Sequence, residues 1–234
     1  MAFIEVGTAH DQPAGIELDD FTEKGLRVGI FGASGSGKGW LLGLLLEAFH
    51  DLNYPIVCTD PESELWTLQE IGALVLGGPH GDAPIPRAAT GLRDVMRFAA
   101  RTATPLVFDL GYVTDEGPAA LLREGERIMR SFNSATNAAR TAVVLAITEA
   151  EVFAPQVVPR GGEVPQMFAA IQKRGRKRGV IPMLETQRTA DIAKSVITQC
   201  NVRFIGHLDE PLDYDNVKRH ISGWTFEAMR GLPT

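Results

Sequence analysis

The sequence is poor in the residues that build disulfide frameworks, zinc sites and membrane spans. It contains two cysteines, Cys58 and Cys200, both in apolar settings, and this excludes a disulfide framework or a zinc spacing. Gly43 and Glu47 interrupt the apolar run LLGLLLEAF, so no membrane span is expected. No basic segment followed by an apolar one marks the beginning as a secretory signal. We therefore expect a cytoplasmic protein.

Acidic residues outnumber basic ones, but the basic residues are locally concentrated. The formal net charge is −6, which argues against general coating of nucleic acid yet leaves room for a local basic site. Between Lys173 and Arg178, in KRGRKR, five of six residues are basic. This cluster has three open interpretations: an arginine acting in trans on a nucleotide, contacts to DNA phosphates, or a solvated helix end.

The stretch from Leu26 to Phe49 reads as a strand, a phosphate loop and a helix. Gly32, Gly37 and Lys38 have the Walker A spacing, and the backbone N–H groups of such a loop cradle phosphates at a helix N-terminus. The alternative is a glycine-rich turn of the kind common in α/β folds. We predict that ATP is held by Gly32, Ala33, Ser34, Gly35, Ser36, Gly37, Lys38, Gly39 and Trp40.

One position of this loop departs from the Walker A pattern. The residue after the lysine is usually Ser or Thr, whose hydroxyl is a magnesium ligand, and here it is Gly39. Phosphate binding should survive this change, whereas the binding of Mg²⁺ is put in question.

Strands and helices alternate along the chain. This predicts an α/β fold with a mainly parallel central sheet flanked by helices. Residues 1–25 form a short β lead-in with strands FIEV and GIEL, and residues 26–234 form one ATPase core. Further strands are expected at 55–59, 74–76, 105–110, 142–147, 180–187 and 202–208, and helices at 88–102, 115–139, from about 166, at 189–199 and from 212.

Polar residues follow the buried strands where ligands collect in such a sheet. Glu149 is predicted to orient or activate water, while Thr148 stands where a metal-binding aspartate is usual. Either water links Mg²⁺ to Thr148 and Asp60, or the site hydrolyses nucleotide poorly. Glu149 has the alternative of a solvated carboxylate, and Asp60 that of an N-cap for a helix starting at Pro61. Gln187 is suited to sensing the γ-phosphate through its amide, and the alternative is a polar residue at the surface.

Several motifs in order resemble the ATPase core of the HerA/FtsK group of DNA-pumping ATPases, and above all its HerA branch. The resemblance runs from about Ile16 to Thr234. The segments that carry it are IELDDFTEKGLRVGIFGASGSGKG, VCTDPESEL, ITEAEVFAPQ and RGRKRGVIPMLETQRTADIAKSVITQCNVRFIGHL. They are similar to the family's P-loop, its Asp-Pro-x-x-Glu segment, its Walker B stretch and its tract from Gly-Arg-Lys-x-Gly to Gln-Cys-Asn.

The resemblance implies a RecA-like P-loop NTPase fold. It also implies a homo-oligomeric ring, a hexamer, with ATP between subunits and double-stranded DNA in the channel. Arg176 matches the arginine of the family's Gly-Arg-Lys tract and becomes the expected trans finger, with Arg174 and Arg178 as alternatives. Gln187 falls on the sensor position, and Asp60 and Glu149 fall on acidic positions that are linked to hydrolysis in the family. A core of this size is similar to viral genome-packaging ATPases, which implies a nuclease, capsid or portal protein as partner in the host cytoplasm or the virion.

The chain departs from the family pattern at four positions: Gly39, Thr148, Glu151 and Thr189 stand where Ser or Thr, an acidic residue, His and Pro are usual. Two hypotheses follow. The first is an ATP-driven DNA translocase, and the alternative is a nucleotide-binding ring with weak or no hydrolysis that scaffolds a DNA-processing partner. A small-molecule P-loop kinase is a distant third.

Overall fold

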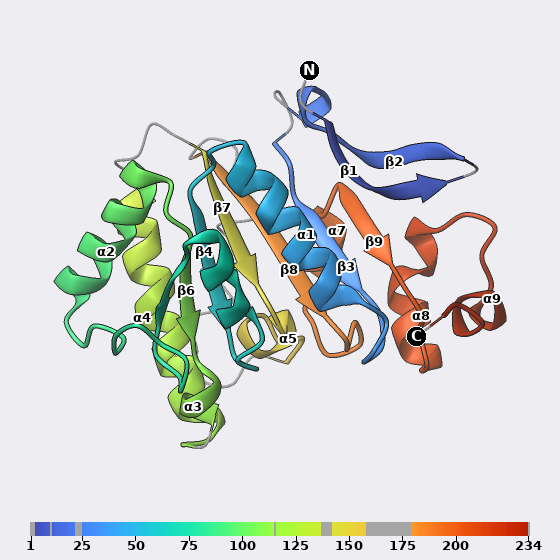
Figure 1. The fold of residues 1–234 in the computed structure, drawn as a ribbon. Helices are drawn as coiled ribbons and strands as arrows, with labels where there is room; N and C mark the ends of the chain where they lie inside the picture. The colour runs from blue at the N-terminus through green and yellow to red at the C-terminus, as the bar shows by residue number, and fades with distance from the viewer. Residues whose placement is uncertain are drawn as a thin grey trace.

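The computed structural model describes residues 3–9, 11–21, 25–114, 116–136, 142–157 and 179–233. The basic cluster at 173–178, which includes Arg176, and the helix predicted from about residue 166 lie outside the described residues. The described parts form a layered α/β structure around one large sheet (Figure 1).

Seven strands form the sheet in the order β5-β6-β4-β7-β8-β3-β9, and every neighbouring pair is parallel. The predicted parallel sheet is thus confirmed. The run AVVLAI forms β7 at the centre of the sheet, where a continuous apolar strand is buried on both faces. The strands are β3 (Val28–Phe31), β4 (Ile56–Asp60), β5 (Leu74–Leu76), β6 (Leu106–Asp109), β7 (Val143–Ile147), β8 (Val180–Thr186) and β9 (Val202–Ile205).

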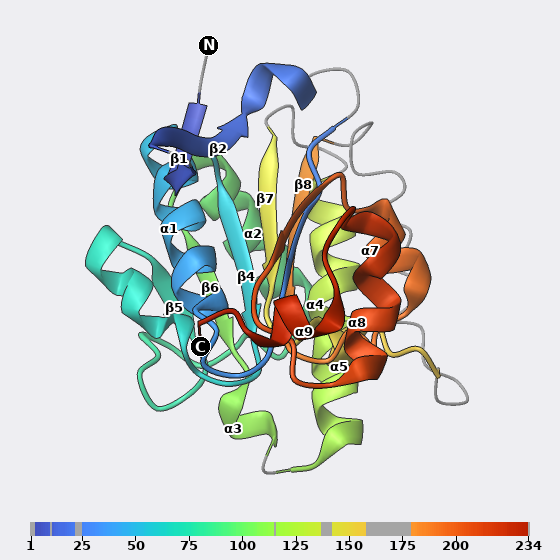
Figure 2. The same cartoon turned by 90° about the vertical axis from the view of Figure 1, so that its right-hand side faces the viewer.

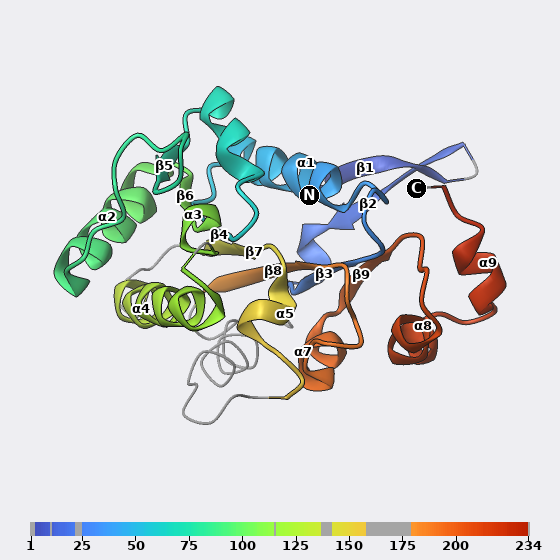
Figure 3. The same cartoon turned by 90° about the horizontal axis from the view of Figure 1, so that it is seen from below.

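One face of the sheet is covered by helix α1 (Lys38–Asp51), the 3₁₀ helix η2 (Leu65–Ile71) and an N-terminal hairpin. The hairpin pairs β1 (Phe3–Ala9) with β2 (Gln12–Glu17) in antiparallel fashion, and η1 (Leu18–Phe21) follows it. Ile4 and Ile16 of the hairpin are buried in the same hydrophobic cluster as the apolar side of α1. Figure 3 shows these elements together on one side of the sheet.

The opposite face packs against α2 (Ala89–Thr102), α4 (Pro118–Thr136), α5 (Ala150–Phe153) and α7 (Lys194–Gln199). In Figure 2, α4 and α7 lie on the side of the sheet away from α1. The apolar spacing that predicted α2 is the spacing by which Leu92, Met96 and Ala99 enter the core. Within the described residues, no helix has the length and apolar character that crossing a bilayer requires.

The C-terminal part differs from the single last helix that the sequence predicted. Helix α8 (Pro211–Val217) starts as expected, but it passes into the 3₁₀ turn η3 (Lys218–His220) and then into a separate helix α9 (Phe226–Arg230). Two short helices, α3 (Gly111–Thr114) and α5, were also not predicted. Since all seven strands are parallel, their carboxyl ends meet at one edge, at the lower side of the sheet in Figure 1.

Candidate functional site

The loop from Gly32 to Lys38 joins β3 to α1 at this edge and has the backbone that a phosphate cradle needs. Gly35 and Gly37 have φ angles of 77° and 81°, in the left-handed region that favours glycine. Gly32 is required for a different reason, because a Cβ there would lie 2.6 Å from Ser36 Oγ. Ser36 Oγ is buried and has no hydrogen-bond partner among the described residues. The loop therefore fits a ligand that accepts hydrogen bonds.

Lys38 is held inside this loop rather than in solvent. Its side chain is 8% exposed, and Nζ donates a hydrogen bond of 3.0 Å to the carbonyl oxygen of Ala33. The ammonium group also lies 3.6 Å from Glu185 Oε1. Its charge is thereby placed at the mouth of the cradle, where the phosphates of a nucleotide would meet it.

Glu149 and Gln187 meet at the ends of β7 and β8. Gln187 Nε2 donates a hydrogen bond of 2.8 Å to Glu149 Oε1. Glu149 has a φ of 44°, a left-handed conformation that is uncommon for a residue other than glycine and is found at functional sites. Beside it, Glu151 Oε2 accepts a hydrogen bond of 2.5 Å from the hydroxyl of Thr186.

Two carboxyl groups of this site bind their protons unusually tightly. Burial raises the pKa of Glu149 to about 8, with a further contribution from the neighbouring Glu151, while the charge of Lys38 acts in the opposite direction. Burial likewise raises the pKa of Glu185 to about 7, although Lys38 again favours the ionised form. Such shifts cluster at functional sites, where desolvation and like charges are concentrated.

Asp60 lies at the end of β4, buried, and is linked to Thr148. The Thr148 hydroxyl is 3.3 Å from Asp60 Oδ1, which also accepts a 3.2 Å hydrogen bond from the backbone N–H of Glu62. Asp60 Oδ2 accepts a hydrogen bond of 2.7 Å from the N–H of Leu65, the first residue of η2, so Asp60 does stabilise the start of a helix. The predicted start at Pro61 is wrong, however, because η2 begins at Leu65.

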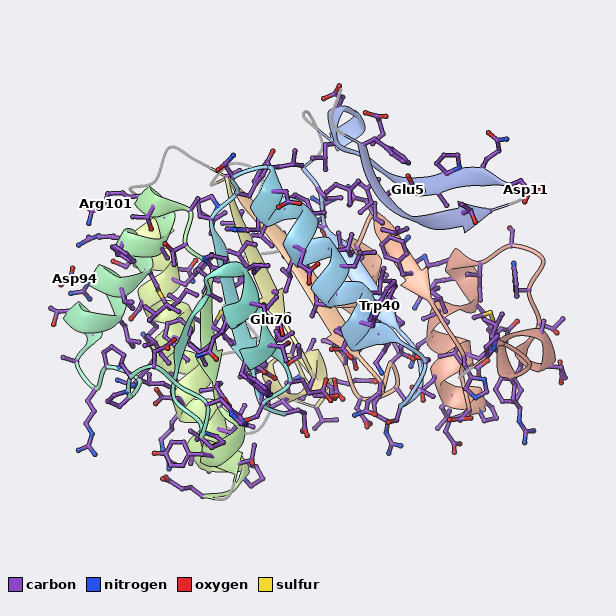
Figure 4. The ribbon with its side chains drawn as sticks, in the orientation of Figure 1. Glu5, Asp11, Trp40, Glu70, Asp94 and Arg101 are labelled. Atoms are coloured by element: carbon purple, nitrogen blue, oxygen red, sulfur yellow. The ribbon has the colours of Figure 1, made fainter. Side chains whose placement is uncertain are left out.

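Gly39 and Trp40 line a cavity of about 450 Å³ between α1 and η2, together with Glu64 and Thr148. Trp40 is 72% exposed and lies on the outer side of α1 near its start, as Figure 4 shows. The structure therefore puts Gly39 and Thr148 on one cavity, as their expected shared relation to a metal requires. Trp40 lies at the rim of this cavity rather than inside the phosphate loop.

Sequence reasoning missed two residues of this region. Glu185 is a buried acid in the largely apolar run VIPMLET of β8. An acidic residue in such a run is itself a sign of a functional position, because a buried carboxylate needs a partner. Asp109, at the end of β6 beside Asp60, accepts hydrogen bonds from the hydroxyl of Ser63 at 2.5 Å and from the N–H of Gly111 at 3.0 Å. Within the described residues, no group of three or more His, Cys, Asp or Glu could hold a metal ion unaided.

Comparison with known proteins gives one match to a family model. Residues 4–109 match the family model described as the central domain of helicase HerA. That segment contains the phosphate loop, Asp60 and Glu64. Comparison with curated protein sequences returned no significant match.

Solved structures match most of the chain at low sequence identity. The genome packaging NTPase B204 from Sulfolobus turreted icosahedral virus 2, in complex with ATP-gammaS, is 16% identical with a TM-score of 0.61, over 90% of this chain and 89% of that chain. VirB4 of Thermoanaerobacter pseudethanolicus is 12% identical with a TM-score of 0.68, over 98% and 91%. The pCW3 conjugation coupling protein TcpA is 14% identical with a TM-score of 0.54, over 92% and 56%.

The fold is that of the P-loop NTPases among these structures, and residues 4–109 match the central domain of helicase HerA. The resemblance expected from the motifs and the expected fold class are both confirmed. The roles predicted for Lys38, Asp60, Glu149 and Gln187 stay predictions, now with positions at one edge of the sheet. The role of Arg176 also stays a prediction, because it lies outside the described residues.

Two of the residues that depart from the HerA/FtsK pattern make defined contacts. Glu151 accepts the Thr186 hydroxyl. Thr189 is buried, and its hydroxyl lies 3.0 Å from Asp213 Oδ1 and 2.8 Å from the Asp213 carbonyl oxygen, while Asn216 Nδ2 donates to the Thr189 carbonyl at 3.0 Å. Thr189 therefore ties the loop after β8 to α8, a contact for which proline has no donor.

Proposed function

We propose that this protein is an ATP-driven DNA translocase that works as an oligomeric ring, in genome packaging or a related form of DNA pumping. The observation that carries the proposal is the meeting of Lys38, Glu149 and Gln187 at the carboxyl edge of a HerA/FtsK-type sheet. The genome packaging NTPase and the conjugation coupling protein among its structural neighbours support the DNA-related part. Both neighbours were solved with the ATP analogue ATP-gammaS, and this supports nucleotide binding by the present chain.

Each site residue has a chemical task in this proposal. The loop amides and Lys38 hold the phosphates, and the orphaned hydroxyl of Ser36 is available to donate to them. Glu149, whose pKa is raised to about 8, is in its ionised form a stronger base than an ordinary carboxylate, and this form accepts a proton from the attacking water. Gln187 holds the Glu149 carboxylate in place and senses the γ-phosphate through the same amide.

The donor set at the cavity beside Gly39 fits a magnesium ion bound together with a nucleotide. Oxygen ligands suit Mg²⁺, which usually takes one or two protein groups and completes its coordination with phosphates and water. We assign to it, through water, Thr148, which lines the cavity, and Asp60, which is buried with its Oδ1 3.3 Å from the Thr148 hydroxyl. When bound, Mg²⁺ supplies charge neutralisation at the phosphates.

The ring and its arginine finger are the remaining parts of the proposal. In P-loop ATPases an arginine supplied by a neighbouring subunit stabilises the charge of the transition state, and it is worth about a thousandfold or more in rate. We assign this role to Arg176. Double-stranded DNA would occupy the channel of the ring, and a nuclease, capsid or portal protein would be the further partner.

The proposal is tested by ATP hydrolysis with and without double-stranded DNA. DNA should stimulate phosphate release by the unmodified protein, and Lys38→Ala and Glu149→Gln should each abolish it. Glu47→Gln, which changes an exposed carboxyl on the same helix as Lys38, is the matched control and should retain the activity. A protein without hydrolysis under any of these conditions would refute the translocase proposal.

A second candidate function is a nucleotide-binding ring that scaffolds a DNA-processing partner with little turnover. The absence of a side chain at Gly39, beside the cavity that Thr148 lines, favours it. In that case Gly39→Ser should create hydrolysis where the unmodified protein has none. Robust magnesium-dependent turnover by the unmodified protein would exclude this candidate.

A further inference from the structure

Gly39 and Glu64 lie against each other at the start of α1. A Cβ built on Gly39 would be 3.3 Å from Glu64 Oε2, and among the described residues it would meet no other heavy atom within 4 Å outside its chain neighbours and the backbone of its own helix. A serine or threonine hydroxyl is carried by that Cβ, one covalent bond further out. Glu64 therefore brings a carboxylate oxygen into the space beside residue 39 that the usual Walker A hydroxyl would use.

The carboxylate of Glu64 has no structural task that would explain this position. Glu64 is the N-cap residue of η2, but its side chain makes no capping hydrogen bond, and Asp60 Oδ2 accepts the N–H of Leu65 instead. Within the described part of the chain, no hydrogen bond or ion pair engages its carboxylate oxygens. The side chain is thus available to a ligand.

The surroundings of Glu64 suit a cation that is bound with a nucleotide. Gly39, Glu64 and Thr148 line the same cavity of about 450 Å³, and Thr148 occupies the Walker B position. The phosphate loop ends directly beside this cavity, because its last residue, Lys38, precedes Gly39. An exposed carboxylate next to a triphosphate would repel it, unless a cation lies between the two negative groups.

We propose that the Glu64 carboxylate takes the place of the missing Walker A hydroxyl as a protein contact to the magnesium ion of the bound nucleotide. The inference rests on the proposed function, because it concerns the same nucleotide site. In this inference Gly39 makes room for the carboxylate of Glu64, the residue that precedes η2. The site can then bind the metal although residue 39 has no hydroxyl.

The test is the effect of Mg²⁺ on nucleotide affinity, which does not depend on turnover. The dissociation constant of a non-hydrolysable ATP analogue is measured by calorimetry with Mg²⁺ and with EDTA, for the unmodified protein and for Glu64→Gln and Glu64→Ala. We expect Mg²⁺ to tighten binding to the unmodified protein. In both variants this gain should shrink by about tenfold or more, while affinity in EDTA stays the same or rises as a negative charge is removed.

Glu70→Gln is the matched control, because Glu70 is an exposed carboxyl on η2 that lines the same cavity without touching Gly39. It should keep the full gain from Mg²⁺. An unchanged gain in both Glu64 variants would overturn the inference while leaving the proposed function standing. Absence of nucleotide binding in the unmodified protein, with and without Mg²⁺, would overturn the proposed function itself.

A reciprocal exchange tests whether the Glu64 carboxylate and a hydroxyl at position 39 have the same role. Gly39→Ser in the Glu64→Ala background should restore part of the gain from Mg²⁺, because the serine then meets no carboxylate at its Cβ. In the otherwise unmodified protein the same serine should add little, since Glu64 already fills that space. Failure of the serine to raise the gain in the Glu64→Ala background would contradict the shared role.

Discussion

Glu185→Gln should remove a pH dependence from the stability of the fold. Glu185 is 4% exposed, and its carboxylate is paired with Lys38 across 3.6 Å. Burial nevertheless raises its pKa from 4.5 to about 7, so desolvation outweighs the attraction of the lysine. Between these two pH values the folded state keeps a proton that the unfolded chain has lost. The stability that the protonated Glu185 carboxyl contributes is therefore fully present below about pH 4.5 and is lost as the pH rises through about 7.

The size of the effect follows from the pKa difference. Since one pH unit corresponds to about 1.4 kcal/mol, a rise from 4.5 to about 7 makes the fold about 3 kcal/mol less stable in alkaline than in acid solution through this carboxyl alone. Glutamine has nearly the same shape and does not titrate. The variant should therefore gain stability relative to the unmodified protein as the pH rises, by about 2–3 kcal/mol at about pH 8.5.

The assay is urea denaturation of both proteins at several pH values between about 5 and 8.5, compared as the difference in the free energy of unfolding. Other titrating groups cancel in this difference to first order. Glu70→Gln, at an exposed position, should follow the unmodified protein at every pH. A Glu185→Gln protein that is less stable than the unmodified one at about pH 8.5 would show that the lysine pair outweighs desolvation, and would refute the reasoning.

Three further predictions concern single side chains. Lys38→Ala should weaken ATP binding by about tenfold or more in calorimetry, because the phosphates lose a charge-assisted partner; unchanged affinity would contradict its placement. Glu149→Gln should slow phosphate release by about a hundredfold or more with little change in affinity, and an equal loss of both would assign it to binding. Thr189→Val should lower the free energy of unfolding by about 1–3 kcal/mol, because Asp213 loses its hydroxyl partner, whereas Thr189→Ser should be nearly neutral in urea denaturation.

The elements that the sequence predicted well are those whose local pattern has one structural solution. AVVLAI can be buried on both faces only in the interior of a sheet, and it is β7 at the centre. The spacing from Gly32 to Lys38 requires a loop with left-handed glycines, and Gly35 and Gly37 adopt that conformation. The order of strand, loop and helix followed from the same stretch.

The local sequence pattern could not predict contacts between segments that are distant in the sequence. Glu185 meets Lys38 because β8 pairs with β3, a register that strand composition does not determine. Glu64 reaches Gly39 because the chain turns into a 3₁₀ helix at Leu65, whereas composition pointed to a helix at Pro61. Helix α9 is five residues long, too short for an apolar period to develop.

The central claim is most directly tested by ATP hydrolysis in the fraction of purified protein whose mass corresponds to a ring, measured with and without double-stranded DNA. The account predicts that this fraction exists, hydrolyses ATP and does so faster when the duplex is present. A protein that remains a single copy and leaves ATP intact, whichever nucleic acid is added, would contradict it.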